Sequence, residues 1–227
     1  MDVRLAAKRS KVLGILTGLV AAGKKGFATS SFQPQSLPLL HMISEVDGLN
    51  DICFTNTGFL FPETLSFAED VCRMFELNLV VLKSDVPKAG QRDARNRFLY
   101  GSDPDLCCHL NKVLPVNAVM HGYDFWVNGV RADQSQARST LREFENKDTD
   151  CIRYHPLLNW SAKDVWEYGR EFSLPEHPLS AVGYQSIGCE PCTVKWDASS
   201  NERNSRWFGL NKTECGLNTD LIASSGN

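Results

Sequence analysis

The chain has 227 residues, 42% of them hydrophobic, which suffices for one hydrophobic core but is short for two full domains. A formal net charge of −3 and a pI of about 6.0 exclude the overall positive charge on which generic binding to nucleic acid or to an anionic membrane depends. Eight cysteines could form a disulfide framework, but a chain of this length does not need one. Two adjacent cysteines and a Cys-x-x-Cys motif favour metal or redox chemistry in a reducing compartment.

The first expected element is an amphipathic helix, because apolar residues recur at helical spacing between residues 3 and 20. Basic residues precede an apolar stretch over residues 12–22, as in a signal peptide. That stretch contains glycine and threonine and is too short to span a bilayer. We therefore expect a helix of a cytoplasmic protein and no targeting sequence.

After this helix, short apolar runs alternate with longer amphipathic ones, which is typical of βαβ units around a parallel sheet. The pattern predicts an α/β fold with strands over residues 26–31, 52–56, 79–82, 118–121, 125–130 and 151–155, and with helices over residues 37–46 and 62–75. A further helix is expected to begin at Ser161, which forms a Ser-x-x-Asp cap with Asp164.

Regular structure is expected to end near residue 174, where prolines and glycines become frequent. Few apolar residues follow residue 201. We therefore predict one domain over residues 1–200 and a C-terminal tail over residues 201–227 that covers the domain surface.

The cysteines include two close pairs, Cys107-Cys108 and Cys189-Glu190-Pro191-Cys192, separated by roughly eighty residues, and two loops of one fold commonly supply ligands to one metal centre in this way. Either pair alone also fits buried cysteines or a redox dithiol, and the four together fit a zinc site. Neighbouring residues chelate one small ion awkwardly, whereas a [4Fe–4S] cluster offers a separate iron to each thiolate. The spacing therefore favours the cluster over zinc.

Cys215 lies outside both pairs, close to the C-terminus of the sequence. A thiol that is neither buried nor coordinated is free to react, and the following Gly216 permits close approach to a substrate. The alternative is an incidental surface cysteine.

A polar loop, residues 30–36, follows the first predicted strand and opens a helix, where backbone N–H groups and the hydroxyls of Ser30, Ser31 and Ser36 can hold a phosphate. The loop lacks the glycines and the lysine of a Walker A motif, and a plain strand-to-helix turn with a capping serine also explains it.

Basic residues close in sequence to these motifs are candidates for anion binding. Lys112 stands four residues after Cys108, and therefore on the same face if this stretch is helical. Scattered arginines are usually solvated, so the proximity to the cysteine motifs carries the argument. The candidates are Lys112, Arg131, Arg138, Arg203 and Arg206.

Taken in order along nearly the whole chain, these motifs resemble the assimilatory adenylyl-sulfate and phosphoadenylyl-sulfate reductases. The paired cysteines are typical of the branch that carries an iron–sulfur cluster, which mostly prefers adenylyl sulfate. The matching stretches are the polar loop, Cys107-Cys108 with Lys112, Gly129-Val130-Arg131-Ala132-Asp133-Gln134-Ser135, Gly183-Tyr184-Gln185-Ser186-Ile187-Gly188-Cys189-Glu190-Pro191-Cys192-Thr193, and Glu214-Cys215-Gly216-Leu217.

The resemblance implies an adenine-nucleotide hydrolase-like α/β fold whose modified PP-loop, the polar loop, holds the nucleotide. It implies one [4Fe–4S] cluster on the paired cysteines, a phosphosulfate held by Lys112, Arg203 and Arg206, and a mobile catalytic tail carrying Cys215. The implied partners are adenylyl sulfate and a thioredoxin or glutaredoxin, with neither nucleic acid nor membrane; a homo-oligomer stays open.

The implied chemistry is consistent with first principles. Sulfur in a phosphosulfate anhydride is electrophilic but shielded by anionic oxygens, so attack needs a thiolate together with cations. Cys215 would take the sulfuryl group as an S-sulfonate and release AMP, and a thioredoxin thiol would then release sulfite.

Two departures from the family pattern stand out. Asn218 occupies the position of the family's histidine, which helps to bind the anionic substrate, and asparagine carries no charge. Gln33 and Pro34 replace a glycine and an alanine in the polar loop. Three alternatives stay open: the same reaction on 3′-phosphoadenylyl sulfate, a PP-loop ATP pyrophosphatase, and a catalytically impaired cluster-binding relative.

Overall fold

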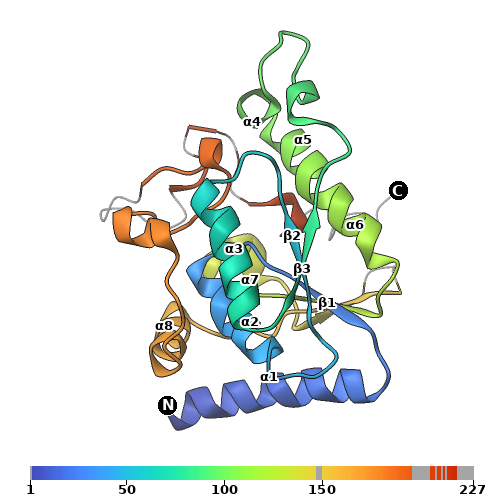
Figure 1. The fold of residues 1–227 in the computed structure, drawn as a ribbon, viewed down its shortest axis with the longest axis vertical. Coiled ribbons are helices and arrows are strands. Elements are labelled where there is room, and N and C mark those ends of the chain that lie inside the picture. Colours follow the sequence, from blue (N-terminus) through green and yellow to red (C-terminus); the bar gives the residue numbers. More distant parts are fainter. Residues whose placement is uncertain are drawn as a thin grey trace.

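A computed structural model describes residues 2–146, 150–195, 205–207, 209–210, 212 and 214–218. Within these residues a six-stranded sheet of order β3-β2-β1-β4-β6-β5 occupies the centre of the fold (Figure 1). Its strands are β1 (Gly26–Thr29), β2 (Asp51–Thr55), β3 (Asn78–Leu82), β4 (Phe125–Asn128), β5 (Phe144–Glu145) and β6 (Ile152–Tyr154). All neighbouring strands pair in parallel except β5 and β6. The predicted α/β class is confirmed.

Side chains alternate between the two faces of the strands, so each strand contributes to two layers of core. One face packs against α1 (Val3–Ala21), α2 (Leu37–Ile43), α3 (Pro62–Met74) and α8 (Ala162–Glu171). The opposite face carries Phe27, Cys53 and Trp126, which pack against α6 (Leu114–Met120). The sheet is therefore covered on both faces, as parallel sheets usually are.

The expected first helix is present as α1, and it runs along one end of the molecule beside α2 (Figure 1). Leu5, Val12 and Leu16 are buried in the core, whereas Val3 is 83% exposed. None of the helices in the described part of the chain is both long enough and apolar enough to span a bilayer.

The strand predicted over residues 118–121 is wrong, because these residues end a helical segment that continues from α5 (Pro104–Cys108) through a π-helical turn (His109–Val113) into α6. Val113, Val116 and Met120 are buried, which is helical spacing and not the alternation of a strand. In the π-helical turn the N–H of Leu114 donates to the carbonyl oxygen of His109. The apolar run thus covers a face of the sheet instead of joining it.

The other predicted strands and helices are present with shifted ends. The first strand stops at Thr29, and Phe32 in the following loop adopts a φ of 54°. Ser161 caps α8 through reciprocal hydrogen bonds with Asp164, as expected. The short antiparallel strand β5 was not predicted. The remaining elements among the described residues are α4 (Leu99–Ser102), α7 (Gln136–Ser139) and 3₁₀ turns at Pro34–Ser36, Lys88–Gly90, Ala132–Gln134, Pro178–Val182, Glu190–Cys192 and Gly216–Asn218.

The connections create a crevice at one edge of the sheet. From β1 the chain proceeds to β2 and β3 on one side and then returns to β4 on the other side of β1. Ligands of open α/β sheets bind where the strand order reverses, at the carboxyl ends of the strands. The crevice therefore lies next to the polar loop that follows β1. The boundary between a domain over residues 1–200 and a tail over residues 201–227 stays a prediction.

Candidate active site

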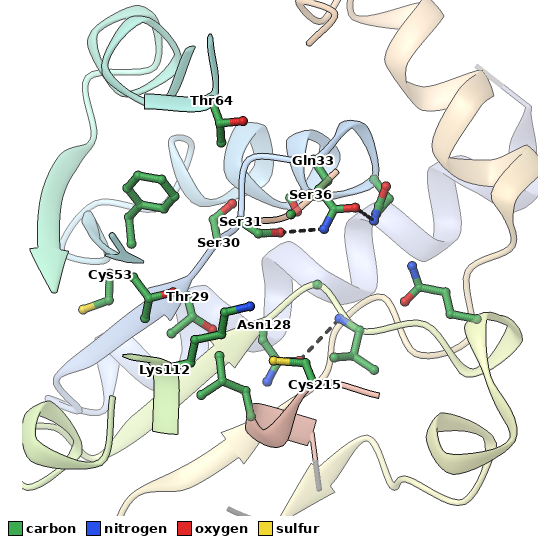
Figure 2. A pocket seen from close by; sticks show the side chains of 18 of the residues that line it. Thr29, Ser30, Ser31, Gln33, Ser36, Cys53, Thr64, Lys112, Asn128 and Cys215 are labelled. Atoms are coloured by element: carbon green, nitrogen blue, oxygen red, sulfur yellow. Dashed lines mark hydrogen bonds between the residues drawn. The ribbon is translucent and has the colours of Figure 1, made fainter. Parts of the chain in front are cut away.

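A pocket opens at the carboxyl ends of β1, β2 and β4, and it gathers side chains that are far apart in the sequence (Figure 2). Seven of the predicted site residues line it: Ser30, Ser31, Ser36, Lys112, Arg138, Arg206 and Cys215. In Figure 2 Lys112 and Cys215 lie on the opposite side of the pocket from the serines of the polar loop. The sequence motifs are thus parts of a single site.

Three predicted residues are not placed in this pocket. Arg131 does not line it, and its Nε donates to Asp133 Oδ1 at 2.9 Å within the same turn. Arg203 lies outside the described residues. The backbone of Asn218 belongs to the 3₁₀ turn Gly216–Asn218, but its side chain also lies outside what the structure describes.

The polar loop is held by hydrogen bonds at both ends. The N–H of Ser30 donates to the carbonyl oxygen of Cys53 at 3.2 Å, and the N–H of Phe32 donates to Ser30 Oγ at 3.0 Å. Gln33 Oε1 accepts from the N–H of Ile187 at 3.1 Å, which ties the loop to the segment that leads into Cys189. Gln33 therefore links the polar loop to the cysteine-bearing loop, at a position where the sequence departs from the pattern it resembles.

The four paired cysteines face one small apolar cavity beside the pocket. Cys107 and Cys108 end α5, while Cys189 and Cys192 flank the turn Glu190–Cys192, and all four line this cavity together with aromatic residues. Thr57 Oγ1 lies 3.3 Å from Cys189 Sγ. Burial, reinforced by the neighbouring Cys189 and Cys192, raises the pKa of Cys107 to about 11.

The four paired cysteines supply the four thiolates that a [4Fe–4S] cluster takes from a protein. Each thiolate of a [4Fe–4S] cluster binds its own iron, so the ligands need only surround a shared cavity. Four buried sulfurs around an apolar space meet that requirement.

Cys215 lies where the cysteine cavity meets the pocket. A hydrogen bond with Cys108 holds the pKa of the Cys215 thiol well below its ordinary value, although burial acts in the opposite direction. The charge of Lys112 and a hydrogen bond from the N–H of Leu217 also lower this pKa. Burial by itself lowers the pKa of the Lys112 ammonium, but the attraction of thiolate charge at Cys215, Cys189 and Cys108 outweighs burial and raises this pKa. Lys112 is thus a cation beside Cys215, and it also lines the cavity of the paired cysteines, near which its spacing from Cys108 predicted it.

Arg206 is buried between the cavity and the pocket. Its Nη1 donates to the carbonyl oxygen of Ile187 at 3.2 Å, and its guanidinium carbon lies 4.8 Å from the centre of the Trp207 ring. A Cβ at Gly188 would stand 2.1 Å from Arg206 Nη2, so only glycine allows this approach. The absence of a side chain at Gly188 therefore leaves room for the guanidinium of Arg206.

Two charged residues of the site were missed by sequence reasoning. Arg153 on β6 lines the pocket with its guanidinium carbon 4.2 Å from the centre of the Trp126 ring, and burial lowers its pKa to about 10, so it stays charged at neutral pH. With the amide oxygen of Asn128 turned toward it, Arg153 Nε donates to that oxygen at 2.9 Å. An arginine inside an apolar strand was the signal available in the sequence. The second missed residue is Glu214, which is buried next to Cys215.

The comparisons with known proteins concern the family and the fold of the chain. The family model of the phosphoadenosine phosphosulfate reductase domain matches residues 26–195. The chain is 37% identical over 190 residues to an adenosine 5′-phosphosulfate reductase of Bacillus cytotoxicus, covering 82% of this chain and 81% of that protein. It is 38% identical over 192 residues to the enzyme of the same name from Oceanobacillus iheyensis, covering 83% and 80%.

Among solved structures, the crystal structure of a phosphoadenylyl-sulfate reductase from Candida auris in a phosphate complex superposes with a TM-score of 0.66. It is 24% identical in sequence, and the match covers 86% of this chain and 98% of that one, so this likeness concerns the fold. The matched segment, the identity to the two relatives and the shared fold together place this chain in the phosphoadenosine phosphosulfate reductase family.

Proposed function

We propose that this protein reduces adenylyl sulfate to sulfite and AMP in assimilatory sulfate reduction, with a thioredoxin or glutaredoxin as the thiol donor. The observation that carries the proposal is the convergence of Cys215, Lys112 and Arg206 on one pocket with the polar loop, beside the four-cysteine cavity. The relatives named adenosine 5′-phosphosulfate reductase favour adenylyl sulfate over its 3′-phosphorylated form. We place the reaction in the cytoplasm.

Two sets of groups in the pocket bind different parts of the substrate. The hydroxyls of Ser30 and Ser31, with backbone N–H groups of the polar loop, hold the nucleotide phosphate. Lys112 and Arg206 neutralise the sulfate oxygens and so expose sulfur to attack. The resemblance adds Arg203 to this set.

The reaction then needs two displacements. The Cys215 thiolate attacks the sulfate sulfur, the bond from sulfur to the bridging oxygen breaks, and AMP leaves with the electron pair. The product is a Cys215 S-sulfonate. A thiolate of the donor attacks Cys215 Sγ, sulfite leaves, and the second donor thiol resolves the mixed disulfide, which completes the two-electron reduction.

Cys107, Cys108, Cys189 and Cys192 would hold one [4Fe–4S] cluster in the adjacent cavity. When bound, the cluster shapes the pocket and its charge and transfers no electron in turnover. Lys112 lies between the cavity and the pocket and therefore orients the Cys215 thiolate from the cluster side.

The S-sulfonate is the test of the mechanism. Incubation with adenylyl sulfate in the absence of reductant should place the adduct on the tryptic peptide that begins after Lys212, because Cys215 is its sole cysteine. Cys215→Ser should form no adduct, whereas Cys72→Ser, a buried cysteine of α3, should form it like the parent. An adduct on another cysteine, or sulfite release by Cys215→Ser at the parent rate, contradicts the mechanism. Parallel reactions with 3′-phosphoadenylyl sulfate identify the preferred nucleotide.

The cluster is tested by iron and sulfide content after anaerobic purification. Serine at any one of the four paired positions should lose iron, and Cys72→Ser should retain it. Zinc in place of iron, or full iron in a variant of a paired cysteine, contradicts the assignment.

A further inference from the structure

The carboxylate of Glu214, the residue before Cys215, is buried in the structure and bound from several directions. Arg138 Nε donates to Glu214 Oε2 at 2.9 Å, and Arg138 Nη2 donates to Oε1 at 2.7 Å. Ser135 Oγ also donates to Oε2 at 2.8 Å, and the N–H of Cys215 donates to Oε1 at 3.0 Å. Glu214 thus joins the backbone of the Cys215 segment to α7.

The guanidinium of Arg138 is occupied in this arrangement. Nε and Nη2 bind Glu214, and the third nitrogen, Nη1, donates to Gln134 Oε1. The side chain of Arg138 is 10% exposed and that of Glu214 is 5% exposed. The two charges therefore neutralise each other away from solvent, although Arg138 also lines the pocket.

The arginine lies on α7, which belongs to the domain and not to the Cys215 segment. Ser135 caps α7, with its Oγ accepting from the N–H of Arg138 at 3.3 Å. Arg138 and Glu214 are 76 residues apart in the sequence. The pair is therefore a tertiary contact between the domain and the segment that carries the reactive thiol.

A bidentate carboxylate–guanidinium pair has a defined geometry, and removing one partner from a buried pair leaves an uncompensated charge. The Cys215 segment therefore has two states. In the docked state the Glu214 carboxylate binds Arg138, and in the undocked state water hydrates both charges. While it is docked, the charge of Arg138 is compensated by Glu214.

We propose that Glu214 is a positioning residue that docks the Cys215 segment on Arg138, so that Arg138 holds the segment in place and does not bind the substrate. This departs from the expectation that Arg138 binds the phosphosulfate. Docking of the Cys215 segment on Arg138 does not require the proposed reductase activity. The effect of docking on sulfuryl transfer rests on the proposed function.

The docking test uses the anaerobically purified protein without nucleotide. The rate of Cys215 alkylation by iodoacetamide is followed on the tryptic peptide after Lys212. Glu214→Ala and Arg138→Ala should each raise the rate by about tenfold or more, and the double variant should show no further increase, because each change breaks the same contact. Arg131→Ala removes another buried arginine of the same region, paired with Asp133, and should leave the alkylation rate near that of the parent.

The opposite charges of the two partners separate docking from electrostatics. By charge alone, loss of Glu214 favours the thiolate and speeds alkylation, whereas loss of Arg138 disfavours it and slows alkylation. Equal increases in both variants support docking. Changes in opposite directions, unchanged rates, or additive effects in the double variant overturn the proposal.

Kinetics distinguish positioning from substrate binding. Glu214→Gln keeps the shape of the side chain and removes its charge, so S-sulfonate formation at saturating adenylyl sulfate should slow by about tenfold or more with little change in KM. Arg138→Gln should behave in the same way. If Arg138→Gln raises KM while Glu214→Gln does not alter the rate, Arg138 binds substrate and the proposal fails. If the parent forms no S-sulfonate, the proposed function fails while the alkylation result still decides docking.

Discussion

The buried carboxylate of Asp164 joins α8 to α1. Its side chain is 0% exposed, and Lys8 Nζ donates to Oδ2 at 2.8 Å while Arg4 Nη1 lies 2.5 Å from Oδ1. Oδ2 also accepts from the N–H and the Oγ of Ser161 at 2.8 and 2.9 Å. Asp164 thus caps α8 and binds the first turns of α1, a helix that precedes the segment matched by the family model.

The substitution Asp164→Asn removes the charge and retains the shape. A hydrogen bond to a charged group contributes about 1.5–3 kcal/mol, and the amide of asparagine would present N–H groups to the ammonium of Lys8. Lys8 and Arg4 are partly exposed and can be hydrated, which reduces the loss. We expect the free energy of unfolding at pH 7 to fall by about 2–4 kcal/mol.

The stabilisation should depend on pH in a defined direction. Burial alone raises the pKa of Asp164, but the hydrogen bonds from Lys8, Ser161 and Arg4 outweigh it and hold this pKa well below the ordinary value of 3.8. The folded state therefore favours the carboxylate, so its stabilisation is complete above the ordinary value and is lost as the pH falls through the lowered pKa. The difference between parent and variant should shrink below about pH 4.

Urea unfolding followed by circular dichroism at pH 7 and at pH 2.5 measures this difference. Glu167→Gln is the matched control, because Glu167 Oε2 lies 3.8 Å from Arg4 Nη2 and is 28% exposed. It should change stability by less than about 1 kcal/mol. A variant at Asp164 that loses the same free energy at both pH values, or none at either, refutes the account of this carboxylate as a paired charge.

Two further predictions concern the site. Gly188→Ala should weaken adenylyl sulfate binding by about tenfold or more in titration calorimetry, because the added Cβ displaces Arg206. Gly101→Ala is the control, since a Cβ there meets no atom within 4 Å. Unchanged affinity in Gly188→Ala contradicts the placement of Arg206. Asn218→His should raise catalytic efficiency by about tenfold, most strongly toward acidic pH where imidazolium is populated, and identical kinetics across pH would show that position 218 does not reach the substrate.

Much of the fold follows from local patterns. The alternation of short apolar runs with amphipathic ones predicted the parallel sheet, and Ser161 predicted the start of α8. Periodicity failed at residues 118–121, because a short apolar run fits either a strand or a buried helix. These residues are helical because they continue the helical segment that begins at Pro104, and because α6 packs on the face of the sheet that carries Phe27, Cys53 and Trp126.

The motifs that line the pocket and the cavity were also recognisable in the sequence where their residues are close neighbours. The spacing from Cys108 to Lys112, the two cysteine pairs and the polar loop each lie within a few residues, so sequence alone identified them as units. Sequence could not identify the partner of each charged side chain. Arg131 and Arg138 looked equivalent, yet one binds Asp133 in its own turn and the other binds a carboxylate 76 residues away.

Two residues show what tertiary structure alone decided. Arg153 reaches the pocket because β6 pairs with β4, which places its guanidinium over Trp126. Gln33 joins the polar loop to the segment before Cys189 because the two loops meet above the sheet. The sequence by itself determined the α/β class and identified the cysteine pairs, since these depend on short-range periodicity and residue chemistry. The pairing of charges depended on which distant segments pack together, because a buried charge takes whichever partner the fold brings within hydrogen-bond distance.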